Sequence, residues 1–326
     1  MVHLDLKDRK LLYWLDQDSR AANKQLAKKV GLSEQAIGYR LKVLENEGVI
    51  KRYVTFVNTL ALGYSHYKVL LRLQNTNPEK ERQLIDYLVA HDHVRWVASC
   101  SGHWDINFSI LAKTPEEFME IYRKIEYEFG DYISEKNVSL LIKSPGFTKG
   151  YLIDKNSLRT LEYVPISPEE ELDELDIKML KAISQDARKS IVALAKEANT
   201  TTDIARYRIR KLEESVISGH TVQLDLQKIG LLRYSVYFSL HRMNDAIEAG
   251  MIEFALIHNN VIFIPWMIGT YDIGLELEVE SHVALERIIK EFRELFSGNI
   301  KDFEIILDTY EYKYDFFPFD ITKIGM

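Results

Sequence analysis

The sequence predicts an α+β protein built from two tandem repeats, each with three short helices followed by a β-α-β-β-α-β unit. The chain has 326 residues, about twice the ~150 residues of a common domain. It also matches itself, since 15–30 aligns with 183–198 and 36–45 aligns with 204–213, both at an offset of 168 residues. Separate segments that share one offset indicate an internal duplication, so both repeats are expected to have the same fold.

The alignment continues through the second part of each repeat at an offset of 167, because Gly48 has no counterpart. It places Gly63 on Gly230, and 102–105 on 269–272. The predicted segments are 1–63 and 64–147 in the first repeat, a linker at 148–171 with two prolines and an acidic end, and 172–230 and 231–318 in the second.

Each repeat opens with the pattern of a helix-turn-helix domain. In the first repeat we predict helices at 4–17, 24–30 and 34–47. Asn23 is expected to cap the second helix and Ser33 the third. Ile37 and Leu41 mark the buried face of the third helix, which Gly48 ends.

The second part of each repeat alternates between strand and helix patterns, in the order of a ferredoxin-like βαββαβ domain. The first repeat has predicted strands at 64–74, 94–101, 104–113 and 134–143, and helices at 78–91 and 115–129. The second has strands near 233–241, 261–268, 271–279 and 302–314, and helices at 245–258 and 282–296.

The net charge of -7 argues at first against a nucleic-acid partner, but the charge is unevenly distributed. Residues 7–52 hold eleven Lys and Arg against six Asp and Glu, and residues 178–228 hold ten against six. The local excess decides whether a phosphate backbone is attracted. Both three-helix segments are therefore predicted to bind double-stranded DNA.

Composition also restricts the compartment. No apolar run approaches the ~18–20 residues that a membrane span needs, and the N-terminus has no apolar signal core, so no membrane partner is expected. The single cysteine, Cys100, excludes an internal disulfide framework. A cytoplasmic location is expected.

Catalytic and metal-binding motifs find little support. The sequence has no P-loop, no G-x-G-x-x-G after a strand, no G-x-S-x-G and no H-E-x-x-H. Cys100 and His103 suggest a metal site, but a structural zinc needs four ligands, and the second repeat has Met267 and Thr270 at these positions. We expect no enzyme, metal or cofactor, and a buried, apolar role for Cys100.

The third helix of each repeat offers side chains for reading DNA. At 100° per residue, Gln35, Tyr39 and Lys42 point away from the core face, and Gln and Lys can bond base edges in a major groove. Arg40 and its equivalent Arg208 lie beside the buried stripe, where they suit either phosphate or a structural ion pair. The candidate DNA-binding residues are Ser33, Gln35, Tyr39, Arg40 and Lys42, with Asp203, Tyr207, Arg208 and Arg210 in the second repeat.

The segment SEQAIGYRLKVLENEGVIKRY, followed by a βαββαβ unit with Gly-His-Trp-Asp between its middle strands, resembles the Lrp/AsnC family of leucine-responsive regulators. The most specific part combines Ser33, Arg40, Leu44-Glu45 and Gly48-Val49-Ile50, and the resemblance covers nearly the whole chain, twice. It implies a winged helix-turn-helix joined to a dimerising domain that responds to an amino acid or related metabolite. One chain would then act as an intramolecular pseudo-dimer, with further homo-oligomers left open.

The resemblance also implies an effector pocket near the turn between the two middle strands. The candidate residues are Gly102, Trp104, Asp105, Gly269, Tyr271 and Asp272. The alternative is local turn chemistry, in which glycine supplies a positive φ and aspartate bonds the backbone.

Two further alternatives stay open. The second repeat has Asn199-Thr200-Thr201 in place of Gly-Leu-Ser and lacks the Gly48 equivalent, which favours a ligand-binding module with a degenerate second reader. The siroheme decarboxylases resemble Lrp/AsnC proteins and can occur fused in tandem. Such an enzyme needs paired His and Arg around an anionic tetrapyrrole, and 231–240 and 262–269 offer Arg233 but no His.

Alternation along the strands predicts how the two sheets meet, since helices cover only one face of each sheet. The other face carries Lys68, Arg72 and Lys143 in the first repeat, and Glu276, Glu278, Glu304 and Asp308 in the second. Pairing of unlike sheets brings opposite charges together, whereas self-pairing opposes like charges. We predict a sandwich of one repeat on the other, with apolar contact from Leu70, Leu111, Leu141, Tyr237 and Ile306.

Overall fold

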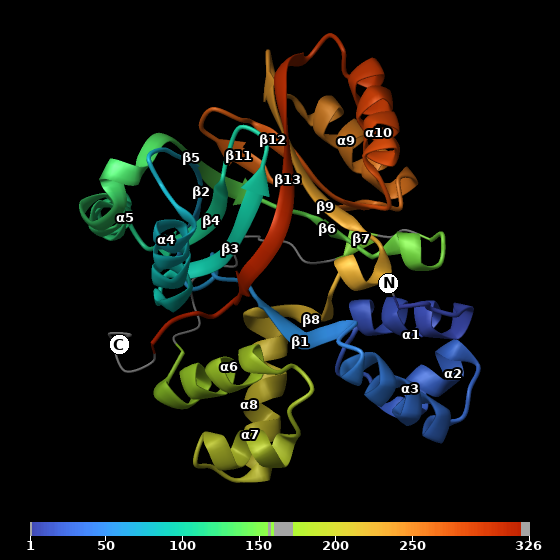
Figure 1. Cartoon of the computed structure of the whole chain (residues 1–326). Helices are drawn as coiled ribbons and strands as arrows, with labels where there is room; N and C mark the ends of the chain where they lie inside the picture. The colour runs from blue at the N-terminus through green and yellow to red at the C-terminus, as the bar shows by residue number, and fades with distance from the viewer. Residues whose placement is uncertain (1, 156–157, 160–171, 321–326) are drawn as a thin grey trace.

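The computed structural model describes residues 2–155, 158–159 and 172–320, and it shows a mixed α/β structure with two similar halves (Figure 1). Each half begins with a three-helix unit and a strand. These elements are α1 (Leu6–Gln17), α2 (Asn23–Val30), α3 (Glu34–Asn46) and β1 (Ile50–Val57) in the first repeat, and α6 (Glu174–Gln185), α7 (Ile191–Glu197), α8 (Thr202–Ser215) and β8 (Ile217–Leu224) in the second. The predicted tandem repeat is confirmed. No helix in the described ranges is long and apolar enough to cross a membrane.

Short polar side chains fix where these helices begin. Asp5 caps α1 and Asp173 caps α6, each in a capping box with the aspartate three residues later. The prediction that Asn23 caps the second helix is wrong. The helix already includes Asn23, and the Ala22 N–H donates to the Gln25 side chain. The Asn23 amide instead accepts a bond from an arginine of the second repeat.

Strands β1 and β8 pair antiparallel and join the two three-helix units; we call this pair the wing ribbon. The strands also exchange partners, since α1 packs against β8 and α6 packs against β1. The core of the first unit accordingly includes Val222 and Leu224 of the second repeat, and the core of the second includes Val54 and Phe56 of the first. Each unit is therefore completed by a strand of the other repeat.

The second part of each repeat is a four-stranded antiparallel sheet with two helices. The first repeat has β2 (Ser65–Leu73), α4 (Pro78–Ala90), β3 (Val94–Ser101), β4 (Ile106–Ala112), α5 (Pro115–Phe129), η1 (Gly130–Tyr132) and β5 (Ile133–Lys143). The second has η3 (Gln227–Ile229), β9 (Leu232–Leu240), α9 (Asp245–Ile257), β10 (Val261–Phe263), β11 (Trp266–Ile268), β12 (Ile273–Val279), α10 (His282–Leu295) and β13 (Ile300–Tyr314). The order β5-β2-β4-β3 recurs as β13-β9-β12-β10/β11, as expected for βαββαβ units.

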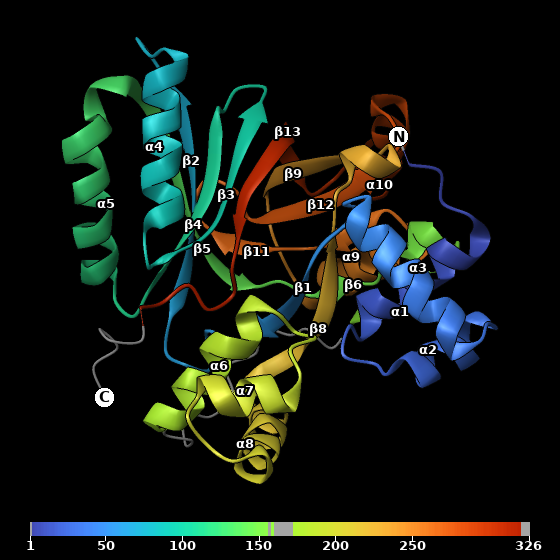
Figure 2. The same ribbon diagram turned by 60° about the horizontal axis from the view of Figure 1, so that its bottom comes forward.

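The two sheets close into one barrel. Strand β13 pairs with β3 of the first repeat, and β11 pairs with both β12 and β5. Figures 1 and 2 show α4 and α5 on one outer side of the strands and α9 and α10 on the other. The predicted pairing of unlike sheets is present within one chain, but as a closed barrel rather than an open sandwich. Closure satisfies the edge strands, whose backbone groups an open sandwich would leave unpaired.

Inside the barrel, Lys68 pairs with Glu276 at 2.9 Å, as the charge pattern predicts. Both residues come from the sheet faces that the helices leave uncovered. The apolar contact between the sheets is one buried cluster, which includes four of the five predicted residues, namely Leu70, Leu141, Tyr237 and Ile306.

Three residues of that prediction lie elsewhere. Leu111 packs in the core of the second three-helix unit. Arg72 pairs with Glu135 of its own sheet at 3.1 Å, and Lys143 pairs with Glu248 of α9. Both basic residues lie at strand ends, where their side chains reach solvent and do not enter the barrel.

Proline divides one predicted strand of the second repeat. Strand β10 ends before Pro265 and β11 begins after it, because proline has no N–H to donate to the ladder.

Part of the predicted linker, 148–171, belongs to the folded structure. Strand β6 (Gly146–Phe147) pairs with β10 and with β7 (Leu158–Arg159), and η2 (Gly150–Leu152) lies between them. Residues 160–171 of that linker lie outside the described residues.

Candidate nucleic-acid interface

Helix α3 presents a polar face outward from the first three-helix unit. The Ser33 hydroxyl accepts from the Ala36 N–H at 3.2 Å and so fixes the start of the helix. On the outer side Gln35, Tyr39 and Lys42 are exposed, and Tyr39 keeps 70% of its surface open. A capped helix with such a face has the form that a major groove admits. The opposite, buried stripe is Ile37, Leu41 and Leu44.

Helix α8 has the same start, although the turn before it differs in sequence. Asn199 stands where the first repeat has Gly31, and it adopts the same left-handed conformation, with φ of 54° against 74°. Asparagine tolerates this region better than most residues. Thr201 then caps α8 through the Ile204 N–H at 3.3 Å. The altered turn therefore keeps its geometry, and the outer face of α8 carries Asp203, Tyr207 and Arg210, all exposed.

Arg40 and Arg208 are held in ion pairs within their own units. Arg40 pairs with Asp8 at 2.6 Å and with Asp5 at 2.8 Å. Arg208 pairs likewise with two aspartates at the start of α6, at 2.7 and 3.0 Å. Bonds from the Asp8 backbone N–H and from Arg40 lower the pKa of Asp5. Of the two roles that the sequence leaves open for these arginines, the structure supports the ion pair.

The two units hold each other through equivalent bonds. Arg20 donates to the carbonyl oxygen of Ala187 at 2.6 Å, and its equivalent, Arg188, donates to that of Ser19 at 2.7 Å. The N–H groups of Ser19 and Ala187 donate in turn to carbonyl oxygens of β8 and β1, both at 3.1 Å. We call these four bonds the arginine clasp. Because they join equivalent residues, they place α3 and α8 in equivalent positions about a local two-fold axis.

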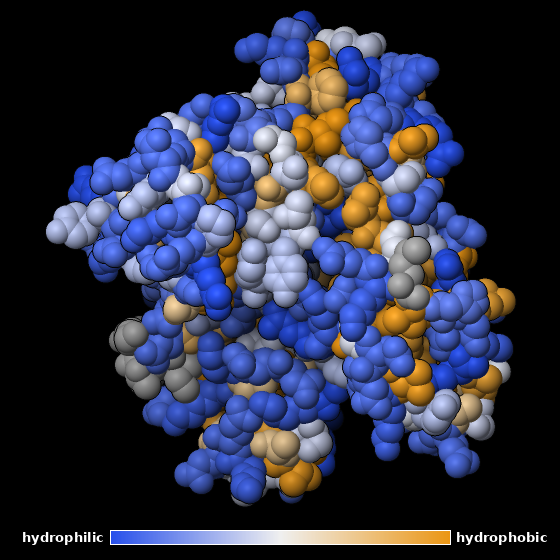
Figure 3. Space-filling view, viewed as in Figure 1, coloured by the Kyte–Doolittle hydropathy of each residue, from blue (hydrophilic) through white to orange (hydrophobic). Residues whose placement is uncertain are grey.

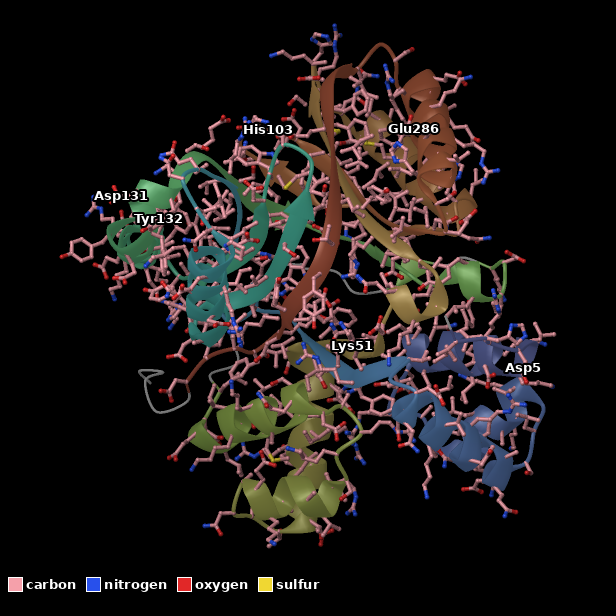
Figure 4. All side chains as sticks on the ribbon, viewed as in Figure 1. Asp5, Lys51, His103, Asp131, Tyr132 and Glu286 are labelled. Atoms are coloured by element: carbon pink, nitrogen blue, oxygen red, sulfur yellow. The ribbon has the colours of Figure 1, made fainter. Side chains whose placement is uncertain are left out.

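The surface around these helices is mainly hydrophilic, with some hydrophobic patches (Figure 3). Figure 3 shows the two three-helix units as separate lobes with predominantly hydrophilic surfaces, and Figure 4 shows Lys51 where the wing ribbon meets the barrel. On α8, Asp203 pairs with Arg206 at 2.8 Å, which offsets part of the positive charge of that face. Exposed lysines of α2 add positive charge beside α3, and they are Lys24, Lys28 and Lys29.

The two candidate effector aspartates bond the backbone at equivalent strand ends. The Asp105 carboxylate accepts from the Leu73 N–H at 2.6 Å, and the Asp272 carboxylate accepts from the Leu240 N–H at 2.7 Å. Each bond reaches a residue 32 positions away in the chain, so these are contacts between strands and not the local backbone bonds of the turn alternative.

The other candidate effector residues lie at the same turns. Gly102 and Gly269 have φ of 132° and 156°, and a Cβ on Gly269 would come within 2.9 Å of a backbone oxygen of β5. Trp104 and Tyr271 are buried in the cluster inside the barrel. Figure 4 shows His103, of the first turn, at the end of the barrel away from the three-helix units.

Two cavities lie at the barrel, and the larger one also reaches the wing ribbon. The larger, of about 210 Å³, has Lys51, Leu226 and Tyr310 in its lining, and the smaller, of about 70 Å³, lies beside Lys68 and Glu276. Trp96 and Arg233 line both cavities. Both are smaller than the ~300–1,000 Å³ pockets of drug-sized ligands.

The barrel also holds a buried ionic group that the sequence prediction only partly anticipates. Glu278 pairs with Lys149 at 2.7 Å and with Arg233 at 2.6 Å, and Arg233 also pairs with Glu311 at 2.6 Å. Burial raises the pKa of Glu278, but Lys149 and Arg233 outweigh burial and bring it to about 2. Lys149 was missed because it lies in the predicted linker. The sequence did hold a signal that this part of the linker is buried. Residues 149–152 are equivalent to 316–319 of the second repeat, and that segment is strongly apolar.

Known proteins resemble both repeats. A family model for winged helix-turn-helix DNA-binding matches residues 4–51, and one for the AsnC-type helix-turn-helix domain matches residues 172–213. The chain is similar to the HTH-type transcriptional regulator LrpA of Pyrococcus horikoshii, with 34% identity over 118 residues, which cover 36% of this chain and 82% of that protein. It is also similar to the regulator FL11 of Pyrococcus abyssi, with 32% identity over 116 residues, covering 36% of this chain and 76% of that protein.

Among solved structures, the siroheme decarboxylase NirDL matches with a TM-score of 0.59. The match covers 95% of this chain and 92% of that chain at 14% identity, so it shows a common fold alone. The regulators are more similar in sequence and match over most of their own length. The chain therefore belongs to the Lrp/AsnC family of helix-turn-helix transcription regulators, whose architecture it carries twice.

Proposed function

We propose that this protein is a sequence-specific DNA-binding regulator that brings two recognition helices, α3 and α8, to one duplex on a single chain. The arginine clasp carries this proposal, because it holds the two helices in a fixed relation without a second chain. In homodimeric helix-turn-helix proteins, association of two chains sets that relation. The preserved caps at Ser33 and Thr201 support a role for both helices.

The protein is further proposed to respond to an amino acid or a related small metabolite. The cavity of about 210 Å³ supports this, because it lies between the wing ribbon and the barrel. A small ligand there would contact Lys51 of the ribbon together with Trp96 and Glu311 of the barrel. Its binding would therefore bias the position of the three-helix units. The turns at 102–105 and 269–272 are the second candidate region for the effector.

Binding-site selection on random duplex DNA tests the proposal, with the full-length protein in the presence and absence of an amino-acid mixture. We expect enrichment of one sequence family, one chain bound per site, and an affinity whose logarithm falls linearly with the logarithm of salt concentration. Failure to enrich any sequence would contradict the proposal. A site whose enrichment or affinity is unchanged by the mixture would contradict the effector part only.

A siroheme-decarboxylase-like enzyme is the second candidate, and the fold match to NirDL over both repeats is the observation in its favour. The two cavities that Arg233 lines support it less well, because a tetrapyrrole needs more space than about 70 or 210 Å³. Arg233, the expected anion-binding residue, is already engaged by Glu278 and Glu311. A Soret band that saturates at one iron tetrapyrrole per chain would favour the enzyme, whereas a salt-sensitive DNA shift would favour the regulator.

A further inference from the structure

The two recognition helices occupy equivalent positions in a two-fold arrangement. The arginine clasp joins Arg20 and Arg188 to equivalent carbonyl oxygens, and the wing ribbon pairs equivalent strands. The caps are equivalent as well, since Ser33 and Thr201 accept from the N–H three residues later. Any difference in what α3 and α8 recognise must therefore come from their side chains.

Helices α3 and α8 have four equivalent outward positions, and three of them carry different residues. The tyrosine is common to both helices, and it is exposed to 70% in α3 and 65% in α8. The side chain of Asp203 is exposed to 89% and pairs with its neighbour on the same helix face, Arg206. The equivalent pairs are Gln35 and Asp203, Gly38 and Arg206, Tyr39 and Tyr207, and Lys42 and Arg210.

These side chains have different partners among base edges. Gln35 can form two bonds to adenine N6 and N7, and Lys42 can donate to guanine O6 and N7. Arg210 can form a fork on guanine, which is a more directional contact than an ammonium makes. Asp203 can accept only from a donor such as cytosine N4, and it repels phosphate.

Building on the proposed function, we propose that the target of this protein is a nonpalindromic duplex with two unlike half-sites in inverted orientation. A protein with two identical recognition helices reads a palindrome, because the symmetry of the site mirrors its own. Here the placement is symmetric and the side chains are not. One chain therefore binds its site in one direction only, and the site acquires a polarity that a homodimer cannot read.

The test is binding-site selection with the full-length wild type and two exchange variants. Gln35→Asp/Gly38→Arg/Lys42→Arg gives both helices the outward residues of α8. A Cβ at position 38 meets only the Asn23 Nδ2 at 3.5 Å, so this position accepts a side chain. Asp203→Gln/Arg206→Ala/Arg210→Lys gives α8 the outward residues of α3, with alanine in place of the glycine at position 38 because glycine destabilises a helix interior. Both exchange variants keep the net charge of the chain, and Gln83→Asp, exposed on α4, is the control that makes the same glutamine-to-aspartate change outside the recognition helices.

The wild type and the control should select the same site with two unlike arms, and each exchange variant should select a palindrome of one of those arms. Replacing one wild-type arm by a copy of the other should weaken wild-type binding about 10–100-fold. A palindrome selected by the wild type, or exchange variants that keep the wild-type site, would overturn this inference and leave the regulator intact. A wild type that enriches no sequence would overturn the proposed function as well.

Discussion

The repeats meet in two places, and the two contacts keep the symmetry of the duplication to different degrees. Between the three-helix units, equivalent residues make equivalent bonds, as Arg20 and Arg188 do. Inside the barrel, equivalent positions differ in charge. Lys68 is equivalent to Ser235, Glu276 to Ser109, and Glu278 to Leu111.

The kind of bond explains this difference. The clasp uses backbone carbonyl oxygens as acceptors, and these persist when neighbouring side chains change. The barrel contact depends on side-chain charge, which two sheets on one chain can divide between them. Two copies of the first sheet would place Ser109 where Glu276 stands, so Lys68 would lose its carboxylate partner, and burying a charge without a partner is costly. The barrel charges thus favour pairing of unlike sheets.

Loss of charge at Glu278 should have the largest effect on stability. Glu278→Gln leaves Lys149 without its buried carboxylate partner, and it removes one of the two partners of Arg233. The free energy of unfolding should fall by about 3–5 kcal/mol, measured by denaturant titration. Glu280→Gln, at an exposed position two residues later, should change it by less than ~0.5 kcal/mol. Equal effects of the two substitutions would contradict an ionic role for the barrel interior.

The symmetry of the clasp predicts similar costs for its two arginines. Arg20→Ala and Arg188→Ala should each lower the free energy of unfolding by ~1.5–3 kcal/mol, because each loses charged bonds to carbonyl oxygens. Arg9→Ala, on the exposed side of α1, serves as the control. A large loss of stability for one of the two variants with none for the other would show that the two arginines contribute unequally, although their bonds are geometrically equivalent.

Two carboxylates of the barrel should respond to pH in opposite directions. Burial raises the pKa of Asp308 to about 6 from 3.8, so its charged form destabilises the fold above pH 6, and this cost disappears as the pH falls toward 4. Glu278, with a pKa of about 2 against 4.5, stabilises the fold above pH 4.5 and loses that contribution as the pH falls toward 2.

Asp308→Asn should therefore raise the free energy of unfolding by ~1–3 kcal/mol at about pH 8 and by little at about pH 4. Denaturant titrations at the two pH values measure the difference. A gain that does not depend on pH would mean that the carboxylate does not titrate in this range.

The smallest expected effect concerns Arg40. Its ion pairs with Asp5 and Asp8 are partly exposed, so Arg40→Ala should cost at most about 1 kcal/mol of stability. It should also leave the salt dependence of DNA binding unchanged, whereas Lys42→Ala should reduce the slope by about 1 if its ammonium lies on a phosphate. A reduced slope for Arg40→Ala alone would return this arginine to the DNA interface.

Patterns local in sequence predicted most of the fold. The cap at Ser33 and the helical periodicity predicted the helix-turn-helix units, and the alternation along the strands predicted the βαββαβ order. The offset between the repeats then predicted that both halves share this order. Contacts between segments far apart in the sequence were harder to predict. The charge pattern predicted the pair of Lys68 with Glu276, but nothing in a single strand indicates that β3 pairs with β13 or that β1 pairs with β8.

The same limit applies to the candidate interface. Exposure of Gln35, Tyr39 and Lys42 follows from helical periodicity, which one helix contains in full. The role of Arg40 depends on carboxylates of α1, more than 30 residues away, and the sequence could only offer two roles for it. The clasp had a usable signal, because arginine stands at position 20 and at its equivalent, 188, in both repeats.

The closed barrel has a consequence for biosynthesis. Strand β3 finds its outer neighbour only when β13 has left the ribosome, about 200 residues later. At ~5–20 residues per second, the edge of β3 stays unpaired for roughly 10–40 s in each nascent chain. Open edges of this kind recruit other strands. A mature molecule with all eight barrel strands paired therefore passes through a stage in which its first half is prone to coaggregate, and translation that stalls between the repeats should make the product dependent on chaperones.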